Sequence, residues 1–129
     1  LRKFYEAKHN NLSRVEIWGD GTPLREFLHV DDCASACLFL MENYNETEFI
    51  NVGSGVEYSV KEVANIIKNK IGFSGEIIFN NLYPNGVLRK IMDVSKINDL
   101  GWRYTISFEE GVNMLISNIE SEIKRFIDK

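Results

Sequence analysis

The sequence is poor in the residues that build metal centres and disulfide frameworks. Its 129 residues include only two cysteines and two histidines. Cys33 and Cys37 are four residues apart, which places them on one face of a helix in an arrangement unsuited to a disulfide between them. His9 and His29 form no paired ligand motif with them. We therefore expect no metal site. We also expect both cysteines to be small core residues of a protein in a reducing compartment.

An excess of positive charge and a long apolar segment are also missing. The chain carries 15 basic and 19 acidic side chains, a formal net charge of -4. This balance disfavours nucleic acid as the main partner, because neutralising phosphates requires a basic face. No apolar run approaches the roughly 20 residues that span a membrane, and the first residues contain no apolar signal-peptide core. We expect no nucleic-acid or membrane partner and a cytoplasmic location.

What the sequence does contain suits one small domain spanning residues 1–129, with 44% hydrophobic residues to form a core. Residues 1–7 are helix formers without a preceding N-cap residue. This start indicates that the chain begins inside an element and is a fragment of a larger protein.

Short extended segments alternate with amphipathic helices along the chain. Strands are predicted at residues 15–18, 26–30, 49–52, 76–79 and 88–92, and helices at 1–7, 31–43, 60–71, 95–100 and from 107 onward. Asp31 and Ser95 are predicted N-caps, while Ser59 with Glu62 and Ser107 with Glu110 are predicted capping boxes. The last helix would bury one apolar face, formed by Val112, Leu115, Ile116, Ile119, Ile123 and Ile127. The alternation predicts an α/β or α+β fold.

Two patterns resemble cofactor or catalytic motifs but are incomplete. The turn at residues 53–55, Gly-Ser-Gly, would need a third glycine to bind a dinucleotide, and Tyr58 occupies that position. Asp31 and Asp32 are adjacent, so on a helix they do not face each other, and capping explains them better than paired acid–base chemistry. We therefore predict neither catalytic nor cofactor-binding residues on this chain.

A set of side chains at the predicted element ends would suit a phosphorylated ligand that carries a ring. The set consists of Lys3, Trp18, Arg25, Arg89 and Lys90. Arg25 is the most informative, because its planar guanidinium matches a phosphate with two parallel hydrogen bonds and a glycine-containing turn precedes it. The alternative is that these are ordinary surface cations and an ordinary core aromatic.

Residues 18–32, WGDGTPLREFLHVDD, closely resemble the W-G-x-G-x-P-x-R-E-F-x-x-V-x-D segment of extended short-chain dehydrogenase/reductases, the NAD-dependent epimerase/dehydratase superfamily. Further segments agree in order: LRKF at 1–4, INVGSG at 50–55, PNGVLRK at 84–90, MDVS at 92–95 and LGW at 100–102. The turn at 53–55 and the LGW segment are shared by many sugar-nucleotide epimerases. Residues 18–32 together with Gly86, Arg89 and Lys90 most resemble the GDP-L-fucose synthase family.

The resemblance implies a C-terminal substrate-binding domain. Enzymes of this family convert GDP-4-keto-6-deoxy-D-mannose to GDP-L-fucose by two epimerisations and an NADPH-dependent reduction. Their NADP(H) site and catalytic residues lie before the position matching Leu1, in a Rossmann half that this chain lacks. The implied parent is a cytoplasmic homodimer, and the chain alone is expected to be inactive and to bind no cofactor.

The resemblance also implies roles for individual residues. Arg25 matches a position that binds the diphosphate, Trp18 would pack near the sugar, and Lys90 matches a basic residue near the nucleotide. Lys3 occupies a position that is usually arginine, and a lysine there keeps the charge without the bidentate geometry. Asn85 stands where the family commonly has aspartate. The predicted substrate-binding residues are therefore Lys3, Trp18, Arg25 and Lys90.

Other functions fit the same pattern. One alternative is a reductase or epimerase of the same branch that acts on another nucleotide sugar, such as a GDP-deoxy-heptose. Another is a non-catalytic module that binds a nucleotide sugar.

Overall fold

A computed structural model describes residues 1–127 of the chain, with side-chain surroundings described through residue 118. Helices and short strands alternate as predicted, in the order α1 (Arg2–His9), β1 (Arg14–Trp18), β2 (Leu24–Glu26), α2 (Val30–Asn43), β3 (Glu57–Ser59), α3 (Val60–Ile71), β4 (Glu76–Asn80), β5 (Arg89–Lys90), α4 (Ser95–Asp99) and α5 (Phe108–Ile127). The mixed α/β class predicted from the sequence is confirmed.

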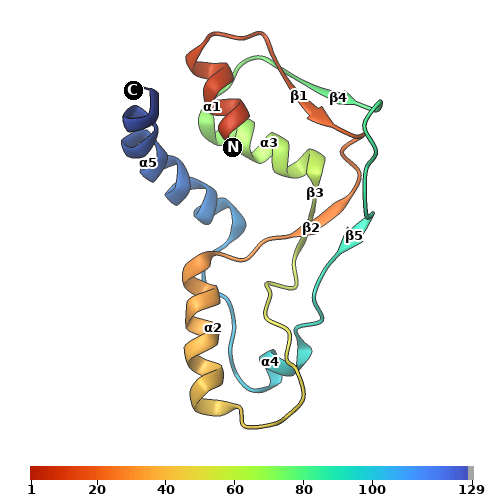
Figure 1. Ribbon diagram of the computed structural model, residues 1–129, viewed down its shortest axis with the longest axis vertical. Helices are drawn as coiled ribbons and strands as arrows, with labels where there is room; N and C mark the ends of the chain where they lie inside the picture. The colour runs from red at the N-terminus through yellow and green to blue at the C-terminus, as the bar shows by residue number, and fades with distance from the viewer. Residues whose placement is uncertain (128–129) are drawn as a thin grey trace.

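One end of the molecule is built on β1 and β4, which pair in parallel with Trp18 opposite Asn80 at their last residues. Helices α1 and α3 lie beside this pair at the top of the molecule (Figure 1). Phe4 of α1 and Phe73, which follows α3, meet edge to face at 5.9 Å between ring centroids. Both rings are buried in a cluster that also contains Val15 of β1. Burying these rings holds the helices against the strands.

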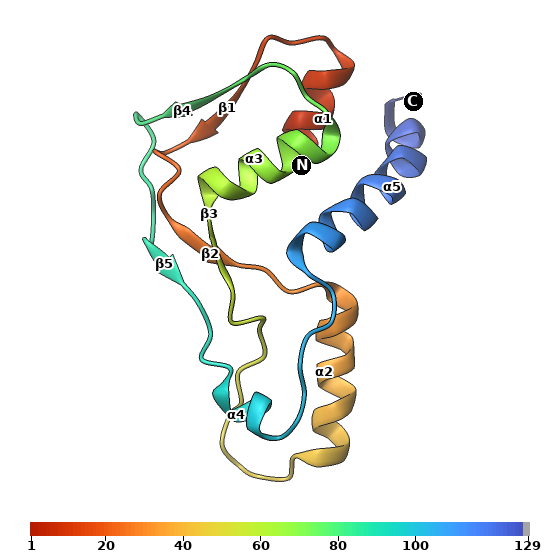
Figure 2. The same cartoon turned by 180° about the vertical axis from the view of Figure 1, so that it is seen from behind.

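The middle of the molecule is a three-stranded sheet in the order β3, β2, β5. Strand β2 pairs antiparallel with β3 and parallel with β5, so it is central although it is only three residues long. In Figure 2 these strands connect the end that holds α1 and α3 to the end that holds α2 and α4.

The opposite end is organised by α2 and α4. Ala36 of α2, Ile97 of α4 and Trp102 are buried together in a second apolar cluster. The indole Nε1 of Trp102 donates a hydrogen bond to the Ser35 hydroxyl at 2.9 Å, so its one polar atom is satisfied. The Leu-Gly-Trp segment thus fixes α4 against α2.

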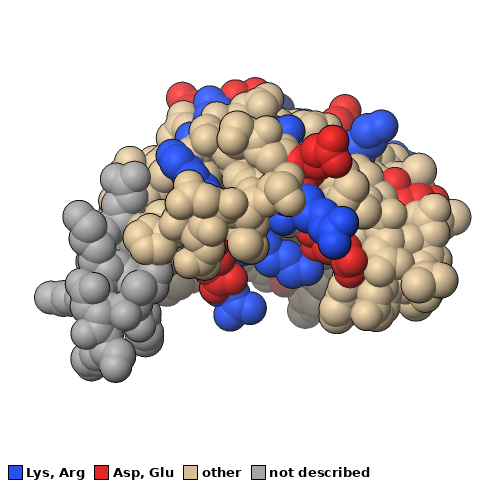
Figure 3. All heavy atoms as spheres, turned by 90° about the horizontal axis from the view of Figure 1, so that it is seen from above, with Lys and Arg blue, Asp and Glu red and all other residues tan. Residues whose placement is uncertain are grey.

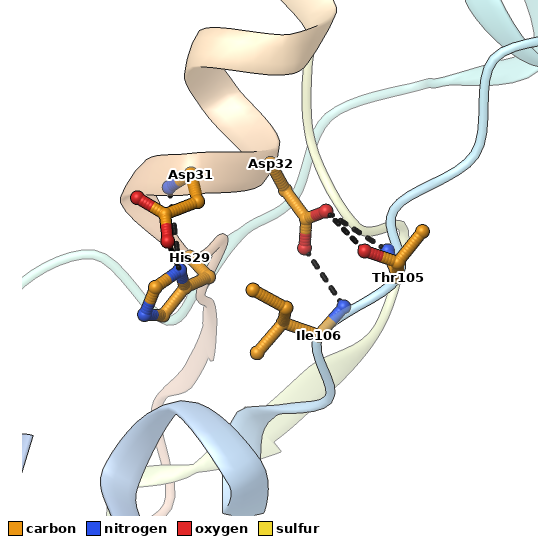
Figure 4. Close-up of polar contacts among 5 residues, drawn as sticks. All are labelled: His29, Asp31, Asp32, Thr105 and Ile106. Atoms are coloured by element: carbon orange, nitrogen blue, oxygen red, sulfur yellow. Dashed lines mark hydrogen bonds and ion pairs between the residues drawn. The ribbon is translucent and has the colours of Figure 1, made fainter. Parts of the chain in front are cut away.

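Helix α2 begins one residue earlier than predicted, at Val30, and its N-cap is His29 rather than Asp31. His29 Nδ1 accepts a hydrogen bond from the Asp31 amide at 3.2 Å. Asp32 is not a cap either: its carboxylate is buried and turns away from the helix towards residues 105–106 (Figure 4). It accepts hydrogen bonds from the Thr105 amide at 3.0 Å, the Thr105 hydroxyl at 2.9 Å and the Ile106 amide at 2.9 Å.

The prediction that Cys33 and Cys37 belong to the core is wrong, since both are exposed on α2. The buried side of the helix carries Asp32 and Ala36 instead. Phe39 and Leu40, which are half-buried, pack with Ala36 in the second apolar cluster, so only one edge of α2 packs against the rest of the described chain.

Three predicted strand boundaries also need correction. Residues 49–52 form no strand, because no described strand lies beside them to pair with their backbone. The run predicted at 26–30 is displaced to Leu24–Glu26, where β3 and β5 supply partners, and the chain then turns into α2. The strand predicted at 88–92 shortens to Arg89–Lys90.

The two predicted capping boxes are confirmed. Ser59 and Glu62 exchange hydrogen bonds at the start of α3, and Ser107 and Glu110 do the same at the start of α5. Ser95 is not a cap; it lies inside α4, and the Asp93 carboxylate accepts from its amide and hydroxyl.

On the predicted apolar face of α5, Val112 is buried and Ile116 half-buried, while Leu115 is 50% exposed. The side chains of Ile119, Ile123 and Ile127 lie outside the described residues. No helix in the described range is long and apolar enough to cross a membrane.

Candidate functional site

The turn between β1 and β2 connects Trp18 to Arg25, two of the predicted site residues. Asp20 folds the turn by accepting hydrogen bonds from the Thr22 amide at 2.8 Å and the Thr22 hydroxyl at 2.7 Å. These hydrogen bonds from Thr22, that of its amide first, lower the pKa of the Asp20 carboxyl group. Gly19 has φ +81°, and a Cβ at this position would collide with the Asn85 side chain. The turn therefore requires glycine and places Trp18 and Arg25 at its two ends.

Arg25 and Lys90 are brought together by the sheet. They are register partners on the parallel strands β2 and β5, so their side chains leave the same face of the sheet. The Arg25 guanidinium donates a hydrogen bond to the Leu24 carbonyl at 2.7 Å. Within the described chain, neither Arg25 nor Lys90 forms an ion pair with a carboxylate. Two neighbouring cations without a counter-charge favour an anion between them.

Arg89 differs from its neighbour Lys90 because it points to the other face of the sheet and is already paired. Its Nε and Nη2 atoms donate to the two carboxylate oxygens of Glu57 at 2.6 and 2.9 Å. The hydrogen bonds from Arg89 hold the pKa of Glu57 below its usual value. Glu57 lies in β3, so the pair spans β2 and fixes β5 beside it. Arg89 is therefore a structural cation, and Lys90 the one available for a ligand.

Lys3 and Trp18 form a second group at the end of β1. The Lys3 ammonium lies 5.4 Å from the centroid of the Trp18 ring and donates to the Glu16 carbonyl at 3.0 Å. Trp18 is 61% exposed, so it is not an ordinary core aromatic residue. A positive charge beside an exposed indole is a favourable cation–π contact.

The sequence pattern did not indicate Tyr83, yet this residue stacks directly on Trp18. The two ring centroids are 4.4 Å apart and the ring planes differ by 14°. The one signal in the sequence was an aromatic residue inside a polar loop, which by itself does not indicate a partner. Trp18 and Tyr83 are 65 residues apart in the chain.

Asn85 holds this loop against the β1–β2 turn. Its side-chain oxygen accepts a hydrogen bond from the Asp20 amide at 2.9 Å. The departure from the family's aspartate thus keeps a hydrogen-bond acceptor, and that acceptor is used within the chain. Loop and turn form one unit as a result.

Exposed charged side chains of both signs are visible on the surface of the molecule (Figure 3). On the face seen in Figure 3, basic residues gather near the middle of the molecule and acidic residues lie next to them. Trp18, Lys3 and Lys90 are exposed, so the predicted site is an open surface. No cluster of three or more potential metal ligands occurs among the described residues.

The glycine turn at residues 53–55 does not fit a dinucleotide. The Glu26 carboxylate already accepts hydrogen bonds from the Gly55 amide at 2.6 Å and the Ser54 hydroxyl at 3.4 Å. A carboxylate therefore occupies the place where a pyrophosphate would have to accept from the turn, and like charges exclude each other there. Glu26 thus holds residues 53–55 in a turn within the chain.

Comparison with known proteins adds a family context. Residues 1–53 match the model of the NAD dependent epimerase/dehydratase family. The chain is 45% identical over 113 residues to GDP-L-fucose synthase 1 of Arabidopsis thaliana, covering 88% of this chain and 35% of that protein. It is 41% identical over 121 residues to the GDP-L-fucose synthase of Escherichia coli, covering 87% of this chain and 38% of that protein. The chain thus spans little more than a third of the length of these relatives.

Solved structures share the fold. A GDP-L-fucose synthetase from Naegleria fowleri superposes with a TM-score of 0.87 at 28% identity, covering 95% of this chain and 38% of that one. A GDP-mannoheptose C4 reductase from Campylobacter jejuni, solved with NADP bound, superposes with a TM-score of 0.80 at 38% identity, covering 90% of this chain and 41% of that one.

Proposed function

Because the chain is related in sequence and fold to the C-terminal part of GDP-L-fucose synthases, we propose that it is the substrate-binding part of such an enzyme. Arg25 and Lys90 bind the diphosphate of a GDP-sugar, with Lys3 adding charge near the ring of Trp18. The observation that carries the proposal is the register of β2 and β5, which aligns two cations without carboxylate partners on one face of the sheet.

In the parent enzyme the reaction would be epimerisation and NADPH-dependent reduction of GDP-4-keto-6-deoxy-D-mannose. The role of this chain is binding and orientation: holding the diphosphate fixes where the sugar ring stands when it reacts. NADP(H) would be held by the Rossmann half, since the glycine turn of this chain is occupied by Glu26. The cofactor supplies the hydride, and no residue of this chain is assigned to that step.

The surface of α2 supports the proposal that a further domain packs on the chain. Five apolar or thiol side chains lie along one side of the helix with the spacing of a helical stripe: Val30, Cys33, Cys37, Leu38 and Met41. All five are exposed, Val30, Leu38 and Met41 to 72, 63 and 78%. We refer to them as the α2 apolar face. Exposed apolar surface of this extent is typical of an interface.

The neighbouring segment 49–52 strengthens this argument. It has the composition of a strand but no strand partner, and Phe49 is 86% exposed. Both α2 and this segment fall inside residues 1–53, which match the NAD dependent epimerase/dehydratase family model. The Rossmann half is therefore the proposed partner of this surface, and a ligand cleft would form between the two domains.

Calorimetric titration of the chain with GDP and UDP tests the proposal. GDP should bind, and more tightly than UDP. Arg25→Ala should weaken GDP binding roughly ten- to a hundredfold, because a charge-assisted phosphate contact contributes about 1.5–3 kcal/mol. Arg14→Ala is the matched control, since Arg14 lies at the other end of β1 and is exposed. Preference for UDP, or equal effects of the two substitutions, would contradict the assignment.

A second candidate is a GDP-heptose reductase. The Campylobacter jejuni GDP-mannoheptose C4 reductase is 38% identical to this chain, close to the 41% of the Escherichia coli GDP-L-fucose synthase. Both candidates bind a GDP-sugar through the same diphosphate contacts, so the titration does not separate them. A product assay on the complete enzyme with GDP-4-keto-6-deoxy-D-mannose and with a GDP-4-keto-heptose does.

A further inference from the structure

The loop between β4 and β5 has an arrangement that the proposed diphosphate site does not use. It places Tyr83 flat against Trp18 at the edge of the sheet where β1 and β4 both end. Trp18 is 61% exposed and Tyr83 41% exposed. Large aromatic rings are usually more deeply buried than this, because each carries a large apolar area.

The chain holds Tyr83 in this position through the backbone. The Asn80 carbonyl accepts from the Tyr83 amide at 3.3 Å and from the Gly19 amide at 2.9 Å, so it connects the loop to the residue after Trp18. The Asn80 side chain accepts from the Leu82 amide at 3.0 Å, which closes the turn before Tyr83. With Asn85 bonded to Asp20 beyond it, the loop is attached on both sides of Tyr83. The ring pair is therefore preformed.

The chemistry of the pair favours a planar ligand. Two nearly parallel rings present a flat π surface, against which a planar heteroaromatic ring can stack. A planar base contacts such a surface over its whole face, whereas a chair-shaped sugar contacts it only through the C–H groups on one side, so the stack fits the base better than the sugar expected beside Trp18. The Tyr83 hydroxyl has no hydrogen-bond partner among the described residues, so within the described chain the ring is held by its stack on Trp18.

The position of the pair agrees with a nucleotide whose diphosphate is bound by Arg25. The β1–β2 turn joins Trp18 directly to the strand that carries Arg25, so stacked base and bound phosphates would lie along one edge of the molecule. Because Lys3 already lies over the Trp18 ring and Tyr83 stacks on it, the ring offered to a ligand is that of Tyr83. We infer that Tyr83, supported from behind by Trp18, forms a stacking platform for the base of the nucleotide sugar. The inference rests on the proposed function and adds a base-recognition residue to it.

Binding of GDP and of inorganic pyrophosphate to the chain, measured by calorimetry, tests the platform. Tyr83→Ala should weaken GDP binding roughly 5- to 100-fold, the effect of removing one aromatic stacking partner, and should leave pyrophosphate binding unchanged. Tyr83→Phe keeps the ring and should bind GDP within about twofold of the unmodified chain. Leu82→Ala is the matched control, because Leu82 is the adjacent residue and is 93% exposed.

The outcomes separate this inference from the proposed function. If Tyr83→Ala binds GDP as the unmodified chain does, or loses GDP and pyrophosphate equally, the platform is wrong while the diphosphate site stands. If the unmodified chain binds pyrophosphate and GDP equally, no base is recognised and the platform is again wrong. If it binds neither, the proposed function fails and the platform with it. Far-UV circular dichroism of each variant verifies that the fold is kept.

Discussion

A single carboxylate, that of Asp32, connects the first turn of α2 to the segment before α5. Burial of this group raises its pKa, but the hydrogen bonds from the Ile106 and Thr105 amides and the Thr105 hydroxyl outweigh it, so the net pKa is lowered. The ionised form is thus the one that the fold stabilises. Adjacent Asp31, in contrast, has a side chain that is 70% exposed.

Asp32→Ala should lower the free energy of unfolding at neutral pH by about 2–3 kcal/mol, because it leaves donors of residues 105–106 unpaired. The pKa of Asp32 is lower in the folded state than in the unfolded state, so its contribution is complete above about pH 4 and is lost as the pH falls through the folded value. Urea unfolding of both proteins between neutral and acid pH measures the effect. The difference in unfolding free energy between the two proteins should become smaller as the pH falls.

Asp31→Ala provides the control for that experiment. It removes the same charge from the same helical turn, and the change expected is about 0.5 kcal/mol or less. Equal destabilisation by the two substitutions would show that charge at the helix start, and not the contact with residues 105–106, is what matters.

At the scale of the element, α3 is the helix on which the site depends most directly. Its first residue donates from its amide to the Pro23 carbonyl at 2.9 Å, and Lys61 donates to the Gly21 carbonyl at 2.9 Å. The start of α3 thus supports the turn that connects Trp18 to Arg25. The capping box of Ser59 and Glu62 fixes where this start occurs.

Removing the cap should therefore destabilise the chain and loosen the turn. Ser59→Ala should cost about 1 kcal/mol of unfolding free energy, the usual value for a lost N-cap, measured by urea denaturation. Ser74→Ala, an exposed serine in the loop before β4, should change it by less than about 0.5 kcal/mol. A cap variant as stable as the Ser74 variant would mean that tertiary packing alone sets the helix start.

On the scale of the whole molecule, the proposed interface with the Rossmann half can be followed through the two native thiols. Cys33 and Cys37 lie in the α2 apolar face and are exposed in this chain. A domain packed on that face would cover them, and access is a main determinant of thiol labelling. No engineered probe is needed for the measurement.

We expect both thiols of the chain to react with maleimide, as measured by mass spectrometry. In a chimera that joins this chain to the preceding part of the Escherichia coli GDP-L-fucose synthase, labelling should slow by at least about tenfold. A cysteine introduced at Leu12, which is 52% exposed and outside the α2 apolar face, should label equally in both proteins when Cys33 and Cys37 are replaced by serine. If the chimera is enzymatically active but its two thiols label as fast as those of the chain alone, the proposed interface is wrong while the proposed substrate-binding function stands.

Local order in this chain was determined by the sequence itself. Both capping boxes depend on residues three positions apart, so the physical cause lies inside the segment concerned. The motif of residues 18–32 likewise indicated Trp18 and Arg25 through the types and spacing of its own residues. Short-range hydrogen bonding and helical periodicity depend only on residues close together in the sequence, so they do not require the rest of the fold.

Only the tertiary structure decided which residues meet. The register that aligns Arg25 with Lys90, the stack of Tyr83 on Trp18 and the bonds from residues 105–106 to Asp32 all join segments more than 60 residues apart. Tertiary contacts also decided three outcomes that differ from a simple sequence expectation. Arg89 is paired with Glu57, residues 49–52 have no strand partner among the described residues, and Cys33 and Cys37 are exposed to solvent. Propensity and spacing do not specify such contacts, because they depend on which surfaces the folded chain brings together.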